Sequence, residues 1–168
     1  KVTGSHLAPV LETLEYIYHE TDTWLELTTL LIPGENDSEA ELHAMTGWVV
    51  ERLGPDVPLH FTAFHPDWKM LSHGRTPLRT LTRARAIALA NGVRYAYTGN
   101  VRDPAGGSSW CHGCGALLIE RDGYRLGTWG LDERGACVAC GEPLPGFFQA
   151  GPGSAPAHPV RVRLASLL

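Results

Sequence analysis

The chain has 168 residues, of which 43% are hydrophobic and 19% are charged. This length suits one ordinary domain plus a small one, and the apolar fraction is sufficient for a hydrophobic core. The net charge of -4 argues against a general nucleic-acid binder, and no apolar run approaches the roughly 20 residues of a membrane-spanning helix.

The first residue is Lys1 rather than methionine, which suggests a processed or excised piece of a longer protein. Nothing near it has the charged, then apolar, then small-residue layout of a secretory signal. We therefore expect a cytoplasmic protein.

The first half of the chain alternates between helical and strand-like patterns. Apolar residues at helical spacing predict an amphipathic helix over residues 7–19. Residues 24–32, rich in apolar and β-branched side chains and followed by Pro33-Gly34, predict a buried strand. Ser38 and Glu41 form a capping box that starts a second helix, which ends at Gly54-Pro55.

The same cycle repeats once more. We predict a strand over residues 59–64, a helix from Thr76-Pro77 to Gly92, and a strand over residues 93–97. Such a series implies parallel strands joined by helical crossovers. Three parallel strands are few for a complete domain, because both sheet faces need cover and both edges stay unpaired. The predicted fold class is therefore α/β, with residues 1–103 as the C-terminal part of a partial, TIM-like (β/α) barrel.

All four cysteines lie in two Cys-x-x-Cys-Gly motifs, the first at residues 111–115 and the second at residues 137–141. Two such pairs typically enclose one tetrahedral Zn²⁺, which gives Cys111, Cys114, Cys137 and Cys140 as predicted ligands. The spacing leaves open a rubredoxin-like iron site, paired disulfides and a redox dithiol. His112, inside the first motif, is a further thiolate replacement to consider, although four cysteines already complete the cage.

The segments around these motifs indicate a small module. Residues 104–109 have the composition of a flexible, turn-rich linker. Between the motifs, residues 116–120 and 124–129 predict two short strands with a turn at Asp122-Gly123, so residues 104–150 have the layout of a zinc ribbon. The Gly-, Pro- and Ala-rich tail, residues 151–168, is expected to be loosely ordered, with one short strand at residues 160–164.

Chemistry in an α/β sheet is expected in the loops that follow the strands, because ligands bind at the carboxyl ends of parallel strands. The candidates in the three loops are Glu35, Asn36 and Asp37, then His65, Asp67, Trp68 and Lys69, then Asn100. Local sequence also allows a purely structural role for each of these loops, as a turn, a helix cap or a packed loop.

The third helix carries a row of arginines that we expect to form a solvated face. They are Arg75, Arg79, Arg83 and Arg85.

Several of these segments, taken in order, resemble one family. They are Leu-Ile-Pro-Gly-Glu-Asn-Asp-Ser at 31–38, Pro-Leu-His-Phe-Thr-Ala-Phe-His-Pro-Asp-Trp-Lys-Met at 58–70, Tyr-Thr-Gly-Asn-Val at 97–101 and the two cysteine motifs. The chain resembles the C-terminal part of the radical S-adenosylmethionine enzyme of the AmmeMemoRadiSam system, a relative of the pyruvate formate-lyase activating enzyme. The resemblance covers residues 3–148 and implies a partial (β/α) barrel followed by a zinc-ribbon-like segment.

The resemblance also implies cofactors. Such enzymes hold a [4Fe–4S] cluster through Cys-x-x-x-Cys-x-x-Cys and cleave S-adenosylmethionine to a 5′-deoxyadenosyl radical. No cysteine precedes Cys111, so the chain alone is expected to be inactive. By alignment with the family, His65 is the first candidate for contact with S-adenosylmethionine or substrate, followed by Thr28, Asn36 and Asp67. The activating enzyme has an arginine where Thr28 aligns, which puts carboxylate binding by that strand in doubt.

Two other functions stay open. One is a stand-alone zinc-ribbon module that binds a protein, such as a companion protein of the same system. The other is a nucleic-acid-binding ribbon, which is disfavoured because residues 110–148 carry no basic stripe. In the enzyme hypothesis the main partner is the missing N-terminal half of the barrel, and the unpaired strand edge predicts self-association of the isolated chain.

Overall fold

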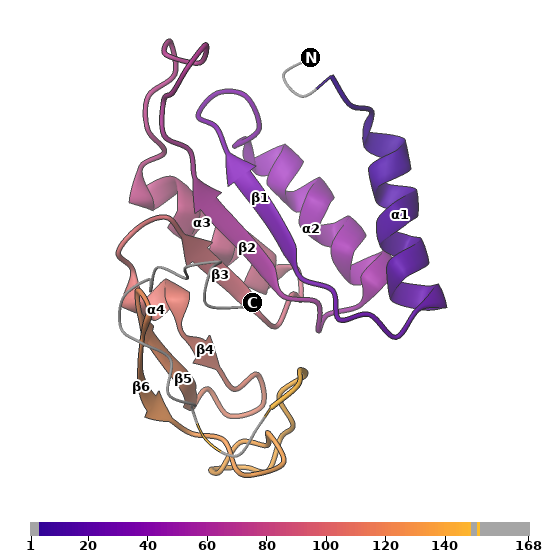
Figure 1. Ribbon diagram of the computed structural model, residues 1–168, viewed down its shortest axis with the longest axis vertical. Coiled ribbons are helices and arrows are strands. Elements are labelled where there is room, and N and C mark those ends of the chain that lie inside the picture. Colours follow the sequence, from indigo (N-terminus) through magenta and orange to yellow (C-terminus); the bar gives the residue numbers. More distant parts are fainter. Residues whose placement is uncertain (1–3, 149–150, 152–168) are drawn as a thin grey trace, which may run out of the picture. The chain divides into compact units, whose positions relative to one another are not determined.

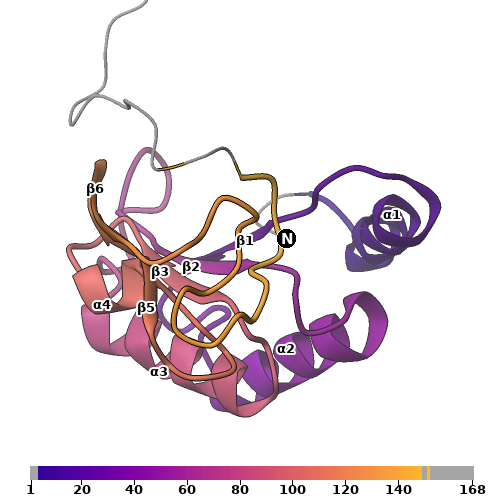
Figure 2. The ribbon, with the colours of Figure 1, turned by 90° about the horizontal axis from the view of Figure 1, so that it is seen from below.

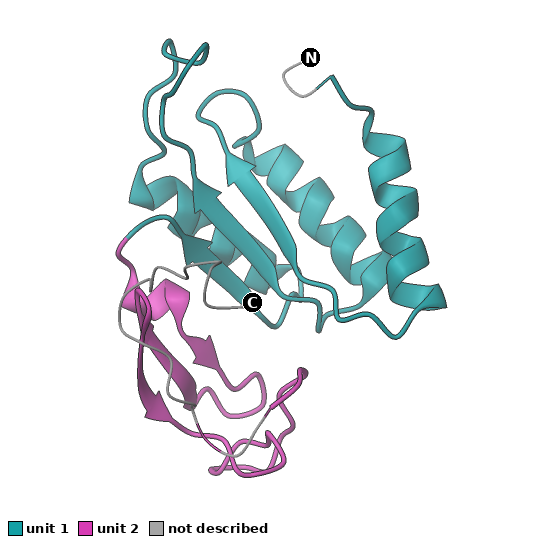
Figure 3. Ribbon diagram, in the orientation of Figure 1, with its two compact units in different colours: residues 1–101 teal, residues 102–168 magenta. Residues whose placement is uncertain are grey.

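A computed structural model describes residues 4–148 and residue 151. The chain divides into two compact units, residues 1–101 and residues 102–168, which are described separately (Figure 3). The sequence placed this division after residue 103. Among the described residues, no helix combines the length and apolar character needed to cross a membrane.

Unit 1 is a mixed α/β structure with a three-stranded, all-parallel sheet in the order β1-β2-β3 (Figure 1). This agrees with the predicted alternation of strands and helices. The parallel sheet requires the chain to cross over between strands, and α2 and α3 make the two crossovers. The elements are α1 (Leu7–Glu20), β1 (Leu27–Leu31), α2 (Glu39–Leu53), β2 (Leu59–Ala63), α3 (Leu78–Ala90) and β3 (Ala96–Gly99).

One face of this sheet packs against α2 and α3, as the two views in Figures 1 and 2 show. Strand side chains alternate between faces, so every second residue of each strand enters this core. Phe61 in the central strand is fully buried, as is Leu31 in β1. The core is completed mainly by Leu42, Val49, Leu59, Leu81, Ala84 and Ala88.

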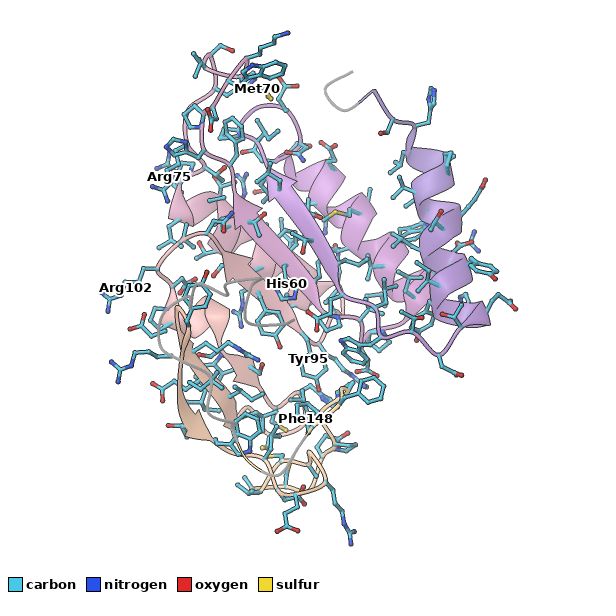
Figure 4. The ribbon with its side chains drawn as sticks, in the orientation of Figure 1. His60, Met70, Arg75, Tyr95, Arg102 and Phe148 are labelled. Carbon is cyan, nitrogen blue, oxygen red and sulfur yellow. The ribbon has the colours of Figure 1, made fainter. Side chains whose placement is uncertain are left out.

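The second face of the sheet carries Thr28, Leu30, His60, Thr62, Tyr97 and Gly99. Thr28 pairs with His60, and His60 with Tyr97, in one row across the three strands. Figure 4 labels His60 on this face. Within residues 4–101 no helix lies on the second face, and α1 stands beside the edge formed by β1 (Figure 2). None of the residues of α1 is buried.

Caps fix the helix ends of unit 1. The Ser38 hydroxyl accepts a hydrogen bond from the Glu41 N–H at 3.3 Å, as the capping box predicts. Gly54, with φ of +81°, ends α2 in a conformation that favours glycine. The prediction of a strand over residues 93–97 was wrong by a few residues. Val93 N–H still bonds to Ala88 in the turn that ends α3, so β3 starts later.

Unit 2 contains a three-stranded antiparallel sheet in the order β4-β5-β6. Its elements are α4 (Pro104–Gly107), β4 (Ser109–Trp110), β5 (Leu117–Asp122) and β6 (Arg125–Trp129). β5 and β6 are the two strands expected between the cysteine motifs. The expected tail strand at residues 160–164, and nearly all of the tail, lie outside the described residues.

The predicted flexible linker at residues 104–109 is wrong. Pro104 begins a single helical turn, and the Asp103 side chain caps it by accepting the Gly106 N–H at 3.1 Å. Proline suits the first helical position because its missing N–H would have no partner there. Ser109 and Trp110 then pair with β5, so this segment is ordered at both ends.

Candidate metal centre

The first motif, residues 111–115, is a tight turn held by two backbone hydrogen bonds. Cys111 N–H donates to the Ala116 carbonyl, and Gly115 N–H donates to the Cys111 carbonyl, both at 2.8 Å. Gly115 has φ of +74°, a left-handed conformation in which a side chain would be strained. The turn therefore requires the glycine that follows the second cysteine.

The second motif, residues 137–141, repeats this turn. Cys137 N–H donates to the Glu142 carbonyl, and Gly141 N–H donates to the Cys137 carbonyl, again both at 2.8 Å. Gly141 has φ of +79°. In each motif the first cysteine is buried and the second is exposed. The two motifs thus present their thiols in the same way.

The four sulfurs form one compact cluster in which all lie within 4.8 Å of one another. Cys111 Sγ is 3.5 Å from Cys140 Sγ, and Cys114 Sγ is 3.8 Å from Cys137 Sγ. A tetrahedron with metal–sulfur bonds of about 2.3 Å has edges of about 3.8 Å. The cluster can therefore hold one metal ion. No other metal-binding group of three or more side chains occurs in the part of the chain that the structure describes.

This spacing bears on the alternatives that the sequence left open. All four sulfurs approach one another, within and between motifs, whereas a redox dithiol brings together only the two cysteines of one motif. The sulfur separations of 3.5 and 3.8 Å both exceed the roughly 2.05 Å of a disulfide bond. A [4Fe–4S] cluster would bind each thiolate at a different iron and hold the sulfurs farther apart. The geometry suits a single ion.

Two of the thiols have opposite tendencies to ionise. Burial opposes ionisation of Cys137, but N–H groups of Ala139 and Cys140 donate to its sulfur, and the net effect lowers its pKa to about 7. Cys140 accepts the Glu142 N–H, which favours its thiolate, yet the neighbouring thiols outweigh this and raise its pKa to about 12. A metal ion that binds all four sulfurs must displace the protons that remain on them.

Asp132 organises the turn that leads into the second motif, a role that sequence reasoning missed. Its Oδ1 accepts the N–H groups of Arg134 and Ala136 at 2.9 and 2.8 Å. These bonds to the charged form hold the pKa of Asp132 below its usual range. An Asp three residues before a glycine is typical of such a turn, and Gly135 has φ of +77°.

The four side chains predicted to contact cofactor or substrate lie in unit 1. His65 and Asp67 are exposed in the loop after β2, Asn36 lies in the loop after β1, and Thr28 is exposed on the second face, inside β1. Among the described residues, no hydrogen bond joins any two of them. The structure therefore places three of the four at the carboxyl edge of the sheet, without assembling them into one constellation.

Asn36 has a structural role within its loop. Its Oδ1 accepts the Ile32 N–H at 2.7 Å, and its Nδ2 donates to the Leu30 carbonyl at 3.0 Å. Asp67 similarly accepts the N–H of Trp68 at 2.7 Å. These are the turn-forming roles that local sequence allowed for both residues.

A contact that sequence reasoning missed joins the loops at this edge. His73 Nε2 lies 2.8 Å from Glu35 Oε1, which connects the loop after β2 to the loop after β1. The buried Thr76 hydroxyl donates to the Leu31 carbonyl at 2.5 Å and accepts the Phe64 N–H at 2.9 Å. Figure 4 shows Met70 at the far tip of this loop. Nothing local in the sequence indicates a pairing across 38 positions.

Three of the four arginines on or near α3 donate to backbone carbonyls, and the fourth, Arg79, is exposed. Arg83 donates to the Asp37 carbonyl and Arg85 to the Ala96 carbonyl, each at 2.8 Å. Arg75 donates to the Asn100 carbonyl at 3.2 Å. They tie α3 and its approach to the neighbouring loops, so they give no support to a phosphate site.

Comparison with known proteins gives a relative without a known function. Over 145 residues, 86% of the chain, the sequence is 40% identical to the uncharacterized protein MJ0808 of Methanocaldococcus jannaschii. The matched region is 43% of that protein, so the chain spans less than half the length of this relative. No protein-family model matches the sequence, and no solved structure matches it. The name of this relative assigns no activity to it.

Proposed function

We propose that the chain is the C-terminal part of a radical S-adenosylmethionine enzyme. Unit 1 supplies three strands and their helices to a (β/α) barrel, and unit 2 is a structural zinc module. The observation that carries the proposal is a parallel sheet whose helices α2 and α3 lie on one face only. Purely parallel sheets normally have both faces covered.

A barrel explains why unit 1 has no helix on the second face of its sheet and why β1 has no partner strand at its outer edge within the described residues. In a (β/α) barrel the helices form an outer ring, and the opposite face of the sheet lines the interior. Thr28, His60 and Tyr97 would then point into the barrel. Leu30 in β1 is 44% exposed, which supports a further element beside it. The missing N-terminal half of the barrel would supply that element.

The carboxyl edge of the sheet would then form part of the active site, since barrel enzymes keep their sites at that end. His65 and Asp67 are exposed there, which supports contact with S-adenosylmethionine or substrate. Asn36 would act by shaping the loop, because both ends of its amide already bind backbone. Thr28 would lie deeper, on the barrel interior.

The radical chemistry itself needs a [4Fe–4S] cluster that this chain does not provide. All four of its cysteines converge on one compact site whose spacing suits a single ion. The cluster would therefore be held by another part of the protein, and the chain alone should cleave no S-adenosylmethionine. Companion proteins of the same system are proposed partners of the whole enzyme.

Zinc is the proposed ion in unit 2. Four thiolates in a closed tetrahedral set are typical of structural zinc, although they also suit iron. Metal analysis of the purified chain should find one zinc per molecule and no acid-labile sulfide. Iron in place of zinc would contradict this assignment, and acid-labile sulfide would indicate a cluster.

The enzyme proposal is tested in the full-length protein. The reading frame upstream should encode Cys-x-x-x-Cys-x-x-Cys, and its absence would reject the proposal. His65→Ala should slow cleavage of S-adenosylmethionine and weaken its binding. His6→Ala, which changes an exposed residue before α1, is the matched control. Unchanged affinity and turnover in His65→Ala would remove His65 from the site.

A stand-alone zinc module that binds a protein is the second candidate. Tyr124 and Val138 on unit 2 are 69% and 68% exposed, and exposed apolar side chains favour a binding surface. Two results would support this function. The upstream reading frame would lack Cys-x-x-x-Cys-x-x-Cys, and association with a companion protein would require the metal. A nucleic-acid-binding ribbon predicts a salt-dependent shift on mixing with DNA or RNA, which we do not expect.

A further inference from the structure

One contact between two side chains connects the two cysteine motifs. His112, between the two cysteines of the first motif, places Nε2 3.1 Å from Oε1 of Glu142, which directly follows the second motif. The His112 side chain is only 17% exposed, and that of Glu142 is 42% exposed. His112 is not one of the clustered ligand side chains, so it does not replace a thiolate.

Glu142 is anchored in the second motif through its backbone. Its carbonyl accepts the Cys137 N–H at 2.8 Å, and its own N–H donates to the Cys140 sulfur. The Glu142 side chain packs against the first motif, because a β-carbon placed on Gly113 would lie 3.5 Å from the Glu142 Cβ and Cγ. Glu142 is therefore bonded to the second motif through its backbone and contacts the first motif through its side chain.

The repeated turn provides an internal comparison. Position for position, Val138 of the second motif corresponds to His112, and Ala116 after the first motif corresponds to Glu142. Val138 is 68% exposed, and neither apolar side chain can form a hydrogen bond or an ion pair. The motifs are therefore bridged on one side of the cluster and unbridged on the other.

We propose that His112 and Glu142 are positioning residues that hold the two motifs together and slow the loss of the metal. Each motif supplies two thiolates, so any movement of the motifs away from each other weakens the hold on the ion and speeds its loss. A bridge between them opposes that movement, in the way that outer hydrogen bonds stabilise metal ligands elsewhere. This inference rests on the proposed metal site.

The test is the rate at which the zinc-loaded whole chain loses zinc to an excess of a chromogenic chelator. His112→Ala and Glu142→Ala should each release zinc about tenfold faster than the unmodified chain. The double variant should be no faster than either single variant, because the two residues act as one pair. Val138→Ala, the matched control, should keep the original rate.

Two outcomes of this experiment would overturn the inference. Either unchanged release from both single variants or fully additive acceleration in the double variant would show that the pair does not hold the motifs. Glu142→Gln guards against misfolding because it keeps the side-chain shape, and it should still accelerate release since an uncharged acceptor binds imidazole less strongly. If the unmodified chain binds no zinc, the proposed metal site fails and this inference fails with it.

Cobalt substitution separates positioning from direct ligation. The Co²⁺-loaded chain should show the absorption of four thiolate ligands, and His112→Ala should leave the band positions unchanged. A shift of those bands in His112→Ala would make His112 a ligand and would overturn its positioning role.

Discussion

Asp132 illustrates how a single exposed carboxylate can organise the turn that leads to a metal ligand. Its charged form accepts two backbone N–H groups, from Arg134 and Ala136, and its pKa is therefore lowered. A carboxylate with a lowered pKa in the folded state stabilises the fold above its unfolded pKa of about 3.9. That stabilisation is lost as pH falls through the lower, folded value.

Asp132→Ala is expected to destabilise unit 2 at neutral pH, because two N–H groups lose their acceptor. Chemical denaturation of the zinc-loaded chain at neutral pH, where the thiolates hold the ion, measures this. Glu133→Ala, at the exposed neighbouring position, is the control. Equal stability of Asp132→Ala and the unmodified chain would contradict this role of the carboxylate.

Thr76 in unit 1 also bonds two backbone groups through its side chain, but unlike Asp132 it is buried. Its hydroxyl satisfies the Leu31 carbonyl and the Phe64 N–H at the carboxyl edge of the sheet. Thr76→Val keeps the shape and leaves both groups without a partner, so the free energy of unfolding should fall by about 2 kcal/mol. Thr82→Val, on the exposed face of α3, should change it little. Equal effects of the two substitutions in urea denaturation would contradict this account.

Among the elements, α1 differs from α2 and α3 in having no buried residue. Polar contacts join it to α2: His19 Nε2 lies 2.8 Å from the Arg52 carbonyl, and Glu15 Oε1 lies 3.5 Å from Arg52 Nε. Exposed contacts of this kind contribute little stability. The apolar residues Leu11, Leu14 and Ile17 of α1 are only half-buried. Leu7 and Val10, which belong to the apolar stripe that predicted this helix, are 70% and 48% exposed.

We therefore expect α1 to open locally more often than the other helices. Amide hydrogen exchange measured by mass spectrometry should show faster exchange in Leu7–Glu20 than in Glu39–Leu53 or Leu78–Ala90. In the full-length protein, cover by the rest of the barrel should slow exchange in α1. Equal protection of the three helices in the isolated chain would mean that α1 is already stably packed.

The elements also show what local sequence can and cannot predict. Apolar periodicity and the cap at Ser38 predicted α2 well, because both act within one or two turns. The helix at Pro104–Gly107 was missed because two glycines masked a cap at Asp103. The cysteine spacing predicted the cluster because each motif is a local turn. The pairs His73–Glu35 and His112–Glu142 were not predicted, since they depend on how distant segments meet.

At the scale of the whole molecule, the two units have cores of different size. Unit 1 has a continuous core between its sheet and two helices. In the described part of unit 2 the buried apolar residues are few, chiefly Leu118, Ile119, Leu131 and Leu144. Small modules of this kind often depend on a metal to fold. The stability of the two units should therefore respond differently to loss of the ion.

Chelation of the metal should unfold unit 2 and leave unit 1 folded. The zinc-loaded chain should unfold in two thermal transitions, and excess chelator should abolish one of them. The helical signal in circular dichroism should persist, because α1, α2 and α3 all belong to unit 1. Loss of that signal on chelation would show that the fold of unit 1 depends on the metal.

The division of each motif into one buried and one exposed cysteine gives the metal centre a direction of attack. Cys114 and Cys140 face solvent, while Cys111 and Cys137 lie beneath them. An incoming thiol or chelator therefore reaches the ion from the outer pair, and the inner thiolates are the last to be displaced. Alkylation during slow metal withdrawal should label the outer cysteines first, so exchange follows an order set by the fold.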